Sequence, residues 1–130
     1  TVVIVTTNTN YAGCRDLNQS IISRMNLVID MDAPDTDTLV SRVVNITGCT
    51  DTGTVVEMAK TVQEINEHCR ETMINDGSCG VRELISWVQS YMVCGSVLES
   101  ANYTVLSSAS SDPENRAEIY STCLEGKFAA

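Results

Sequence analysis

Basic residues are scarce in this sequence of 130 residues. Eight Lys and Arg stand against 17 Asp and Glu, so the formal net charge is -9. Binding to a nucleic-acid backbone depends on clustered Lys and Arg that neutralise the phosphates. The basic residues here are scattered along the chain, so the composition argues against a nucleic-acid-binding protein.

Long hydrophobic runs are missing too. No apolar run approaches the ~20 residues that a membrane-spanning helix needs. The apolar run at residues 2–5 is short and has no basic flank, so it does not have the pattern of a signal peptide. With 43% hydrophobic and 19% charged residues, the composition is typical of a globular domain, which we expect in the cytoplasm with no membrane partner.

The residue types that most often build metal and catalytic sites are also few. His68 is the only histidine, and no Cys-x-x-Cys pair occurs. We therefore expect no zinc site, and a Ser-His-Asp triad would depend on His68 alone. The sequence also has no GxxxxGK[ST] loop for binding phosphates.

The cysteines leave two interpretations open. The chain has six, an even number, and three Asn-x-Ser/Thr glycosylation sequons begin at Asn18, Asn45 and Asn102. These features are typical of a secreted, disulfide-linked domain. Several of the cysteines, however, fall on apolar faces of predicted helices, where a free thiol acts as a small hydrophobic group. We favour free thiols at Cys14, Cys49, Cys69, Cys79, Cys94 and Cys123.

The first 34 residues combine two apolar segments with a short helix. Residues 2–5 are four consecutive β-branched residues, which predicts a strand buried on both faces of a parallel sheet. Residues 17–24 have helical spacing, and residues 26–31 predict a second strand. Asp32-Ala33-Pro34 then breaks the pattern, so we place a domain boundary at Pro34.

The pattern after Pro34 is helical. Residues 35–47 predict a helix that ends at Gly48, and residues 54–57 form a capping-box pattern that opens a long amphipathic helix. A third helix ends at Gly95, a second capping-box pattern covers residues 96–99, and Asp112-Pro113 marks a further start. The predicted fold is mainly α: a bundle of four to five helices over residues 35–130, with two N-terminal β-strands in residues 1–34.

Several motifs together resemble the last part of an AAA+ ATPase module. The strand that ends in Thr6-Thr7-Asn8 resembles the sensor 1 strand of that family. Residues 13–25, GCRDLNQSIISRM, resemble the G-x-x-x-L-P-x-A-x-x-x-R-F segment of the MoxR and dynein-related branch. Residues 80–84, GVREL, resemble the sensor 2 segment. The resemblance implies that residues 1–34 are the end of an α/β core and that residues 35–130 are the helical lid.

The resemblance implies roles for individual residues. Asn8 would be sensor 1 and orient the attacking water. Arg24 would be the arginine finger that reaches the γ-phosphate of a neighbouring subunit, with Arg15 as the competing candidate. Arg82 would be sensor 2 and contact the γ-phosphate bound by its own subunit. Each assignment has a structural alternative. Asn8 could cap a turn, and Arg82 could form an ion pair on the surface of its helix. Arg24 could pair with a surface carboxylate such as Asp30 or Asp32.

The sequence departs from the family pattern at three positions. Thr9 stands where a proline often follows the sensor asparagine, Asn18 replaces the proline of the L-P pair, and Met25 replaces the usual aromatic residue. These differences weaken the resemblance to MoxR itself, but they remain compatible with the wider dynein-related branch.

The resemblance also implies a function for a larger protein. The Walker A and Walker B motifs that hold ATP and Mg²⁺ are absent here, so the chain by itself is expected to be inactive. We expect it to be the C-terminal part of an ATP hydrolase that assembles into a homo-oligomeric ring and remodels a partner protein, with a von Willebrand factor A domain protein as a possible companion. The alternative is a non-enzymatic helical module for protein–protein interaction.

Overall fold

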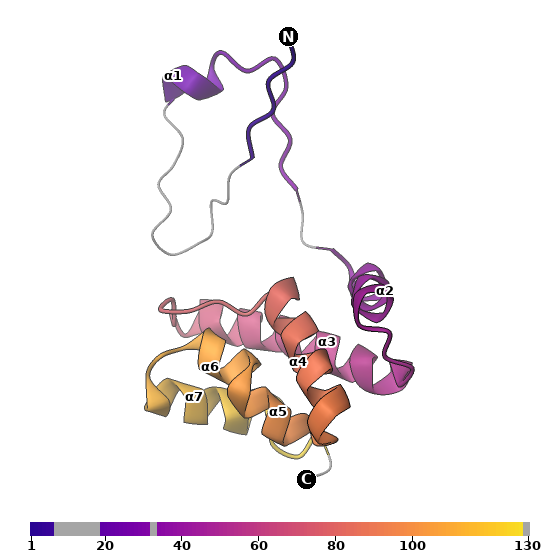
Figure 1. Ribbon diagram of the computed structural model, residues 1–130. Helices are drawn as coiled ribbons and strands as arrows, with labels where there is room; N and C mark the ends of the chain where they lie inside the picture. Colours follow the sequence, from indigo (N-terminus) through magenta and orange to yellow (C-terminus); the bar gives the residue numbers. More distant parts are fainter. Residues whose placement is uncertain (7–18, 32–33, 129–130) are drawn as a thin grey trace. The chain divides into compact units, whose positions relative to one another are not determined.

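The computed structural model describes residues 1–6, 19–31 and 34–128, and it divides the chain into two units (Figure 1). The first unit is Thr1–Ala33 and the second is Pro34–Ala130. The described residues are mainly helical, as the sequence predicts, and none of them is assigned to a strand.

The first unit contains one short helix among its described residues. Helix α1 (Gln19–Ile22) is followed by a turn in which the amide of Arg24 donates to the carbonyl of Ile21 at 3.1 Å. The sequence predicted a helix over residues 17–24, and α1 ends two residues before that range does. Residues 17 and 18 lie outside the described residues.

The two predicted strands are not formed in the described residues. Residues 2–5 and 26–31 have no strand assignment, and their apolar side chains are exposed, with Val2 at 87% and Ile4 at 82%. A strand needs a neighbouring strand for its backbone hydrogen bonds, and no sheet is described in this unit. The described residues therefore do not confirm the two strands, which stay predictions.

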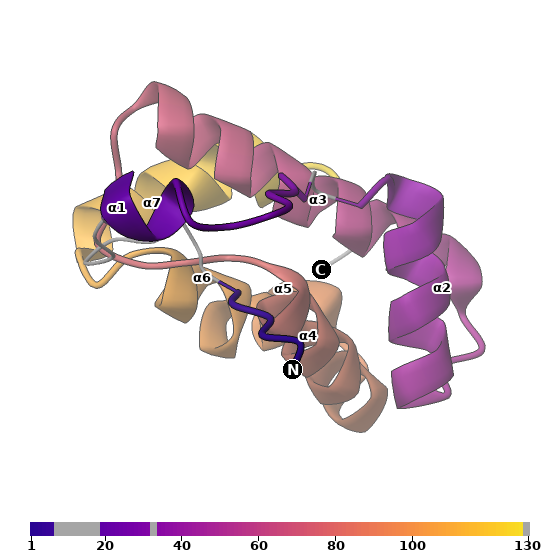
Figure 2. The same ribbon diagram turned by 90° about the horizontal axis from the view of Figure 1, so that it is seen from above.

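The second unit is a helical bundle. Its helices are α2 (Thr36–Thr47), α3 (Thr52–Glu71), α4 (Val81–Cys94), α5 (Val97–Tyr103), α6 (Val105–Ala109) and α7 (Pro113–Ile119), followed by the π-helical turn η1 (Tyr120–Leu124). The sequence predicted one helix from Ser96, but Thr104, with φ -120° and ψ -85°, divides this stretch into α5 and α6. Figure 2 shows α2 crossing α3 at one end of the bundle, where the two helices pack together.

The helix ends follow from local sequence, with one correction. Gly48 and Gly95 end α2 and α4 in the left-handed conformation, with φ of 72° and 77°. The predicted start of the long helix at Thr54 is wrong, because Asp51 is the N-cap of α3 and its side chain accepts from the amide of Thr54 at 3.3 Å. An aspartate and a threonine compete for the cap here, and the carboxylate is the better acceptor.

Two other predicted helix starts are confirmed. The hydroxyl of Ser96 accepts from the amide of Glu99 at 3.2 Å at the start of α5. The carboxylate of Asp112 accepts from the amide of Glu114 at 2.9 Å, and Pro113 is the first residue of α7.

Trp87 lies at the centre of the core. Its side chain is completely buried, its indole N–H donates to the carbonyl of Val97 at 3.0 Å, and its ring meets Phe128 edge-on with centroids 5.9 Å apart. It belongs to α4, which packs against α2, α3, α5 and α6. The other large side chains of the core that are completely buried are Met58, Ile65, Leu84, Ile119 and Leu124.

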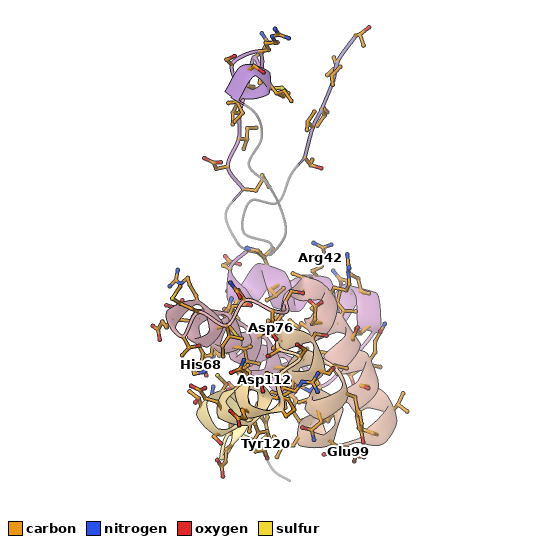
Figure 3. All side chains as sticks on the ribbon, turned by 90° about the vertical axis from the view of Figure 1, so that its left-hand side faces the viewer. Arg42, His68, Asp76, Glu99, Asp112 and Tyr120 are labelled. Atoms are coloured by element: carbon orange, nitrogen blue, oxygen red, sulfur yellow. The ribbon has the colours of Figure 1, made fainter. Side chains whose placement is uncertain are left out.

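The connection between α3 and α4 is held by Asp76 against the connection between α6 and α7. One carboxylate oxygen of Asp76 accepts from the hydroxyl of Ser111 at 2.8 Å, the amide of Ser111 at 3.0 Å and the hydroxyl of Ser110 at 3.0 Å (Figure 3). Hydrogen bonds from Ser111 are the main cause of a lowered pKa at Asp76.

The backbone at Gly77, in the connection between α3 and α4, lies very close to the backbone at the end of α6. The next residue, Ser78, donates its amide to the carbonyl of Ser108 at 2.8 Å. A Cβ atom on Gly77 would lie 2.2 Å from the carbonyl oxygen of Ser108 and 2.6 Å from that of Ala109. Only a residue without a side chain fits at this position.

Substitution of Gly77 is expected to destabilise the second unit. Gly77→Ala should lower the free energy of unfolding by about 1–3 kcal/mol, because two backbone carbonyls must move to make room for the methyl group. Gly53→Ala is the matched control, since no heavy atom lies within 4 Å of a Cβ there and alanine favours the helix. Urea unfolding followed by Trp87 fluorescence measures both, and equal stability of the two variants would contradict the close approach.

The exposed apolar residues of the first unit are expected to drive self-association. Val2, Val3, Ile4, Leu27 and Val28 all expose most of their surface. Apolar β-branched segments with unpaired backbone groups pair readily with other chains. The double variant Ile4→Lys/Val28→Lys should therefore reduce the average mass measured by sedimentation equilibrium at high concentration.

The control for self-association is Tyr103→Lys, which removes an exposed aromatic residue from the second unit. This variant should associate like the unchanged chain. Two results would show that the first unit does not drive association. One is that the chain without substitutions stays monomeric at every concentration, and the other is that the double variant and Tyr103→Lys have equal effects.

Candidate functional site

The N-terminus of α4 carries the candidate phosphate contact. Gly80 is the N-cap, and its amide donates to a carboxylate oxygen of Glu83 at 2.8 Å. Glycine has no side chain to accept from the first turn, so only this half of a capping box is formed. The amides at the start of a helix have no partner within the helix and carry a partial positive charge.

Arg82 is the second residue of α4 and is exposed to solvent. Within the part of the chain that the structure describes, its guanidinium forms no ion pair or hydrogen bond, so the surface ion pair considered as its alternative role is not found. A guanidinium keeps its positive charge and presents several N–H donors that match phosphate oxygens. An arginine beside the start of a 14-residue helix is therefore suited to bind a phosphate group.

Arg24 lies in the first unit, just after the end of α1, and is also exposed. Among the described residues no ion pair joins it to Asp30, which was one of its alternative partners, and Asp32 lies outside the described residues. Arg24 and Arg82 belong to different units, so each is described only within its own unit.

Asn8 and Arg15 lie outside the described residues. The sensor 1 assignment of Asn8 and the competing finger assignment of Arg15 stay predictions.

His68 lies on α3 and is mostly buried beside α7. Its Nε2 atom is 3.5 Å from a carboxylate oxygen of Glu118 but has no hydrogen-bond partner in a suitable geometry (Figure 3). Within residues 1–6, 19–31 and 34–128, no group of three or more His, Cys, Asp and Glu side chains could hold a metal ion.

The described cysteines are all free thiols. Cys49, Cys79 and Cys123 are buried, Cys69 is half-buried and Cys94 is exposed, while Cys14 lies outside the described residues. Burial is the main cause of a raised pKa at Cys69, Cys79 and Cys123, so these thiols stay protonated and act as apolar core groups.

Sequence reasoning missed two acidic residues that organise the second unit, Asp51 and Asp76. The Asp-Thr-Gly-Thr sequence at residues 51–54 contains a capping signal that could have revealed Asp51 as an N-cap. No local signal pairs Asp51 with Tyr91, whose hydroxyl donates to its carboxylate at 3.0 Å from 40 residues away.

In the described part of the chain, no helix combines the length and apolar character that crossing a membrane requires. No protein-family model, curated protein or solved structure matches this chain.

Proposed function

We propose that this chain is the C-terminal part of an AAA+ ATPase of the MoxR and dynein-related type, which couples ATP binding and hydrolysis to the remodelling of a partner protein. The observation that carries the proposal is the position of Arg82. It stands exposed and without an ion pair among the described residues, at the N-terminus of a helix fixed in the core by Trp87.

Three residues have separate roles at the nucleotide in this proposal. Arg82 contacts the γ-phosphate of the ATP bound by its own subunit, and Arg24 reaches the γ-phosphate of the neighbouring subunit. Asn8 orients the attacking water through its amide, which both donates and accepts. ATP and Mg²⁺ are held by Walker motifs that this sequence does not contain, so this chain alone has no ATPase activity.

The exposed first unit supports the same proposal. Residues 2–5 and 27–29 are apolar and rich in β-branched side chains, but they have no sheet to join among the described residues. In a complete ATPase core, both segments would be strands covered on both faces. The proposed assembly is a homo-oligomeric ring in the cytoplasm, with a von Willebrand factor A domain protein as the candidate companion.

A non-enzymatic interaction module is the second candidate. Val93 is 90% exposed on the second unit, and such a module would offer this apolar side chain to a partner. The two candidates differ in one measurable property, because only the ATPase turns over nucleotide.

The finger assignment is tested in the full-length protein by Arg24→Ala. Nucleotide turnover should fall by about 10³-fold or more, because a finger acts on transition-state charge. Nucleotide binding to the same subunit should persist, since the finger serves the neighbouring site. Steady-state phosphate release and equilibrium binding of a fluorescent ATP analogue measure the two effects.

The control is Arg42→Ala, which removes an exposed arginine of α2 that has no ion pair among the described residues (Figure 3). It should leave turnover unchanged. Unchanged turnover in Arg24→Ala refutes the finger assignment, and a full-length protein without any nucleotide turnover favours the interaction module.

A further inference from the structure

Helices α2 and α4 end at the same surface hollow. The two helices pack against each other, and the hollow has a volume of about 340 Å³. Its lining comes from the segment that joins α2 to α3 and from the last turn and C-cap of α4. The lining residues are Gly48, Cys49, Thr50, Asp51, Tyr91, Met92 and Gly95.

Both helix ends give this hollow a negative character. The amide of Gly48 donates to the carbonyl of Val44, and the amide of Gly95 donates to the carbonyl of Tyr91, each at 2.8 Å. The later carbonyls of each helix have no partner within the helix. A helix C-terminus of this kind carries roughly half a negative charge.

The carboxylate of Asp51 adds a full charge at the same place. One of its oxygens accepts from the hydroxyls of Thr54 at 2.7 Å and Tyr91 at 3.0 Å, and the other accepts from the amide of Thr54 at 3.3 Å. Hydrogen bonds from Thr54, followed by that from Tyr91, lower the pKa of Asp51, so it is ionised at neutral pH. A carboxylate has about four acceptor positions, so Asp51 retains capacity for another donor.

None of the described residues that line the hollow has a positive side chain to balance these charges. Asp51 and the two helix C-termini, offset by the N-terminus of α3, sum to roughly -1.5 elementary charges. One apolar side chain, Met92, lines the hollow. Two further exposed apolar residues are near the lining residues in sequence: Val93, which follows Met92 and is 90% exposed, and Ile46, two residues before Gly48, which is 53% exposed.

We propose that this hollow binds an arginine side chain of a partner protein. The guanidinium donates to the carboxylate of Asp51 and to the last carbonyls of α2 and α4, while its aliphatic stem lies on Met92. Arginine suits the site because its planar fork can donate to several acceptors at once. Apolar residues beside the arginine contact Val93 and Ile46. The site lies at the opposite end of α4 from Arg82 and does not depend on nucleotide binding.

Nuclear magnetic resonance titration of the ¹⁵N-labelled chain tests the proposal. The probe is a blocked leucine-arginine-leucine peptide, and its matched control replaces arginine with citrulline, which is nearly isosteric and neutral. The arginine peptide should shift the amides of Gly48, Cys49 and Gly95, and the citrulline peptide should bind at least about tenfold more weakly. Arginine amide alone should shift the same amides at higher concentration, because it lacks the flanking leucines.

Variants identify the charge that is responsible. Asp51→Asn should weaken peptide binding about tenfold while α3 remains formed, because asparagine caps a helix as well as aspartate does. Glu71→Gln, which removes one exposed negative charge at the other end of α3, should change affinity less than about twofold.

Several results would overturn the proposal. One is an arginine peptide that leaves the amides of residues 48–51 and 95 unshifted. Equal affinity of the arginine and citrulline peptides, or equal effects of Asp51→Asn and Glu71→Gln, would show that the hollow does not recognise a cation. Circular dichroism confirms that each variant keeps its helices, so that a loss of binding is not a loss of fold.

Discussion

Burial of Trp87 is the constraint on which the helical unit depends. Its large side chain is completely enclosed, and its indole N–H must find an acceptor there, which it does at the carbonyl of Val97. This bond joins α4 to the start of α5, while the rings of Trp87 and Phe128 meet in a T-shaped arrangement. Because α4 also packs against α2, α3 and α6, its direction is fixed by neighbours on several sides.

A fixed α4 places two different polar groups at its opposite ends. Its 14 residues span about 21 Å, with Arg82 in the first turn and Tyr91 in the last. The helix dipole gives the first end positive and the second end negative character. The first end therefore suits a phosphate and the second a cation, so the two proposed sites draw on one helix without sharing a residue.

The parts of this fold that local sequence determines could be predicted. Gly48 and Gly95 end helices because glycine adopts positive φ without strain, and Ser96 and Asp112 begin helices because their side chains accept from nearby amides. The start of α3 was predicted from the wrong residue because Asp51 and Thr54 both have the chemistry of a cap. The mainly helical character of the described residues after Pro34 was predicted from the apolar pattern together with these capping signals.

The remaining features depend on contacts that no local pattern encodes. Asp76 meets Ser110 and Ser111, and Asp51 meets Tyr91, across separations of 34 to 40 residues. The split at Thr104 likewise has no glycine or proline to mark it. The strands at residues 2–5 and 26–31 were predicted from composition, but a strand exists only where a partner supplies its hydrogen bonds. Arg82 was proposed as a site residue from the resemblance of residues 80–84 to the sensor 2 segment, and that role stays a prediction.

The most direct test of the nucleotide proposal compares ATP and ADP affinity in the full-length protein with and without Arg82. Only ATP has the γ-phosphate that Arg82 is proposed to contact, and a charged hydrogen bond is worth about tenfold to a hundredfold in affinity. Calorimetric titration of a non-hydrolysable ATP analogue and of ADP gives both affinities. The account predicts that Arg82→Ala weakens binding of the ATP analogue by about that factor and leaves ADP binding unchanged. If Arg82→Ala changed neither the affinity for the ATP analogue nor the affinity for ADP, the result would contradict the account.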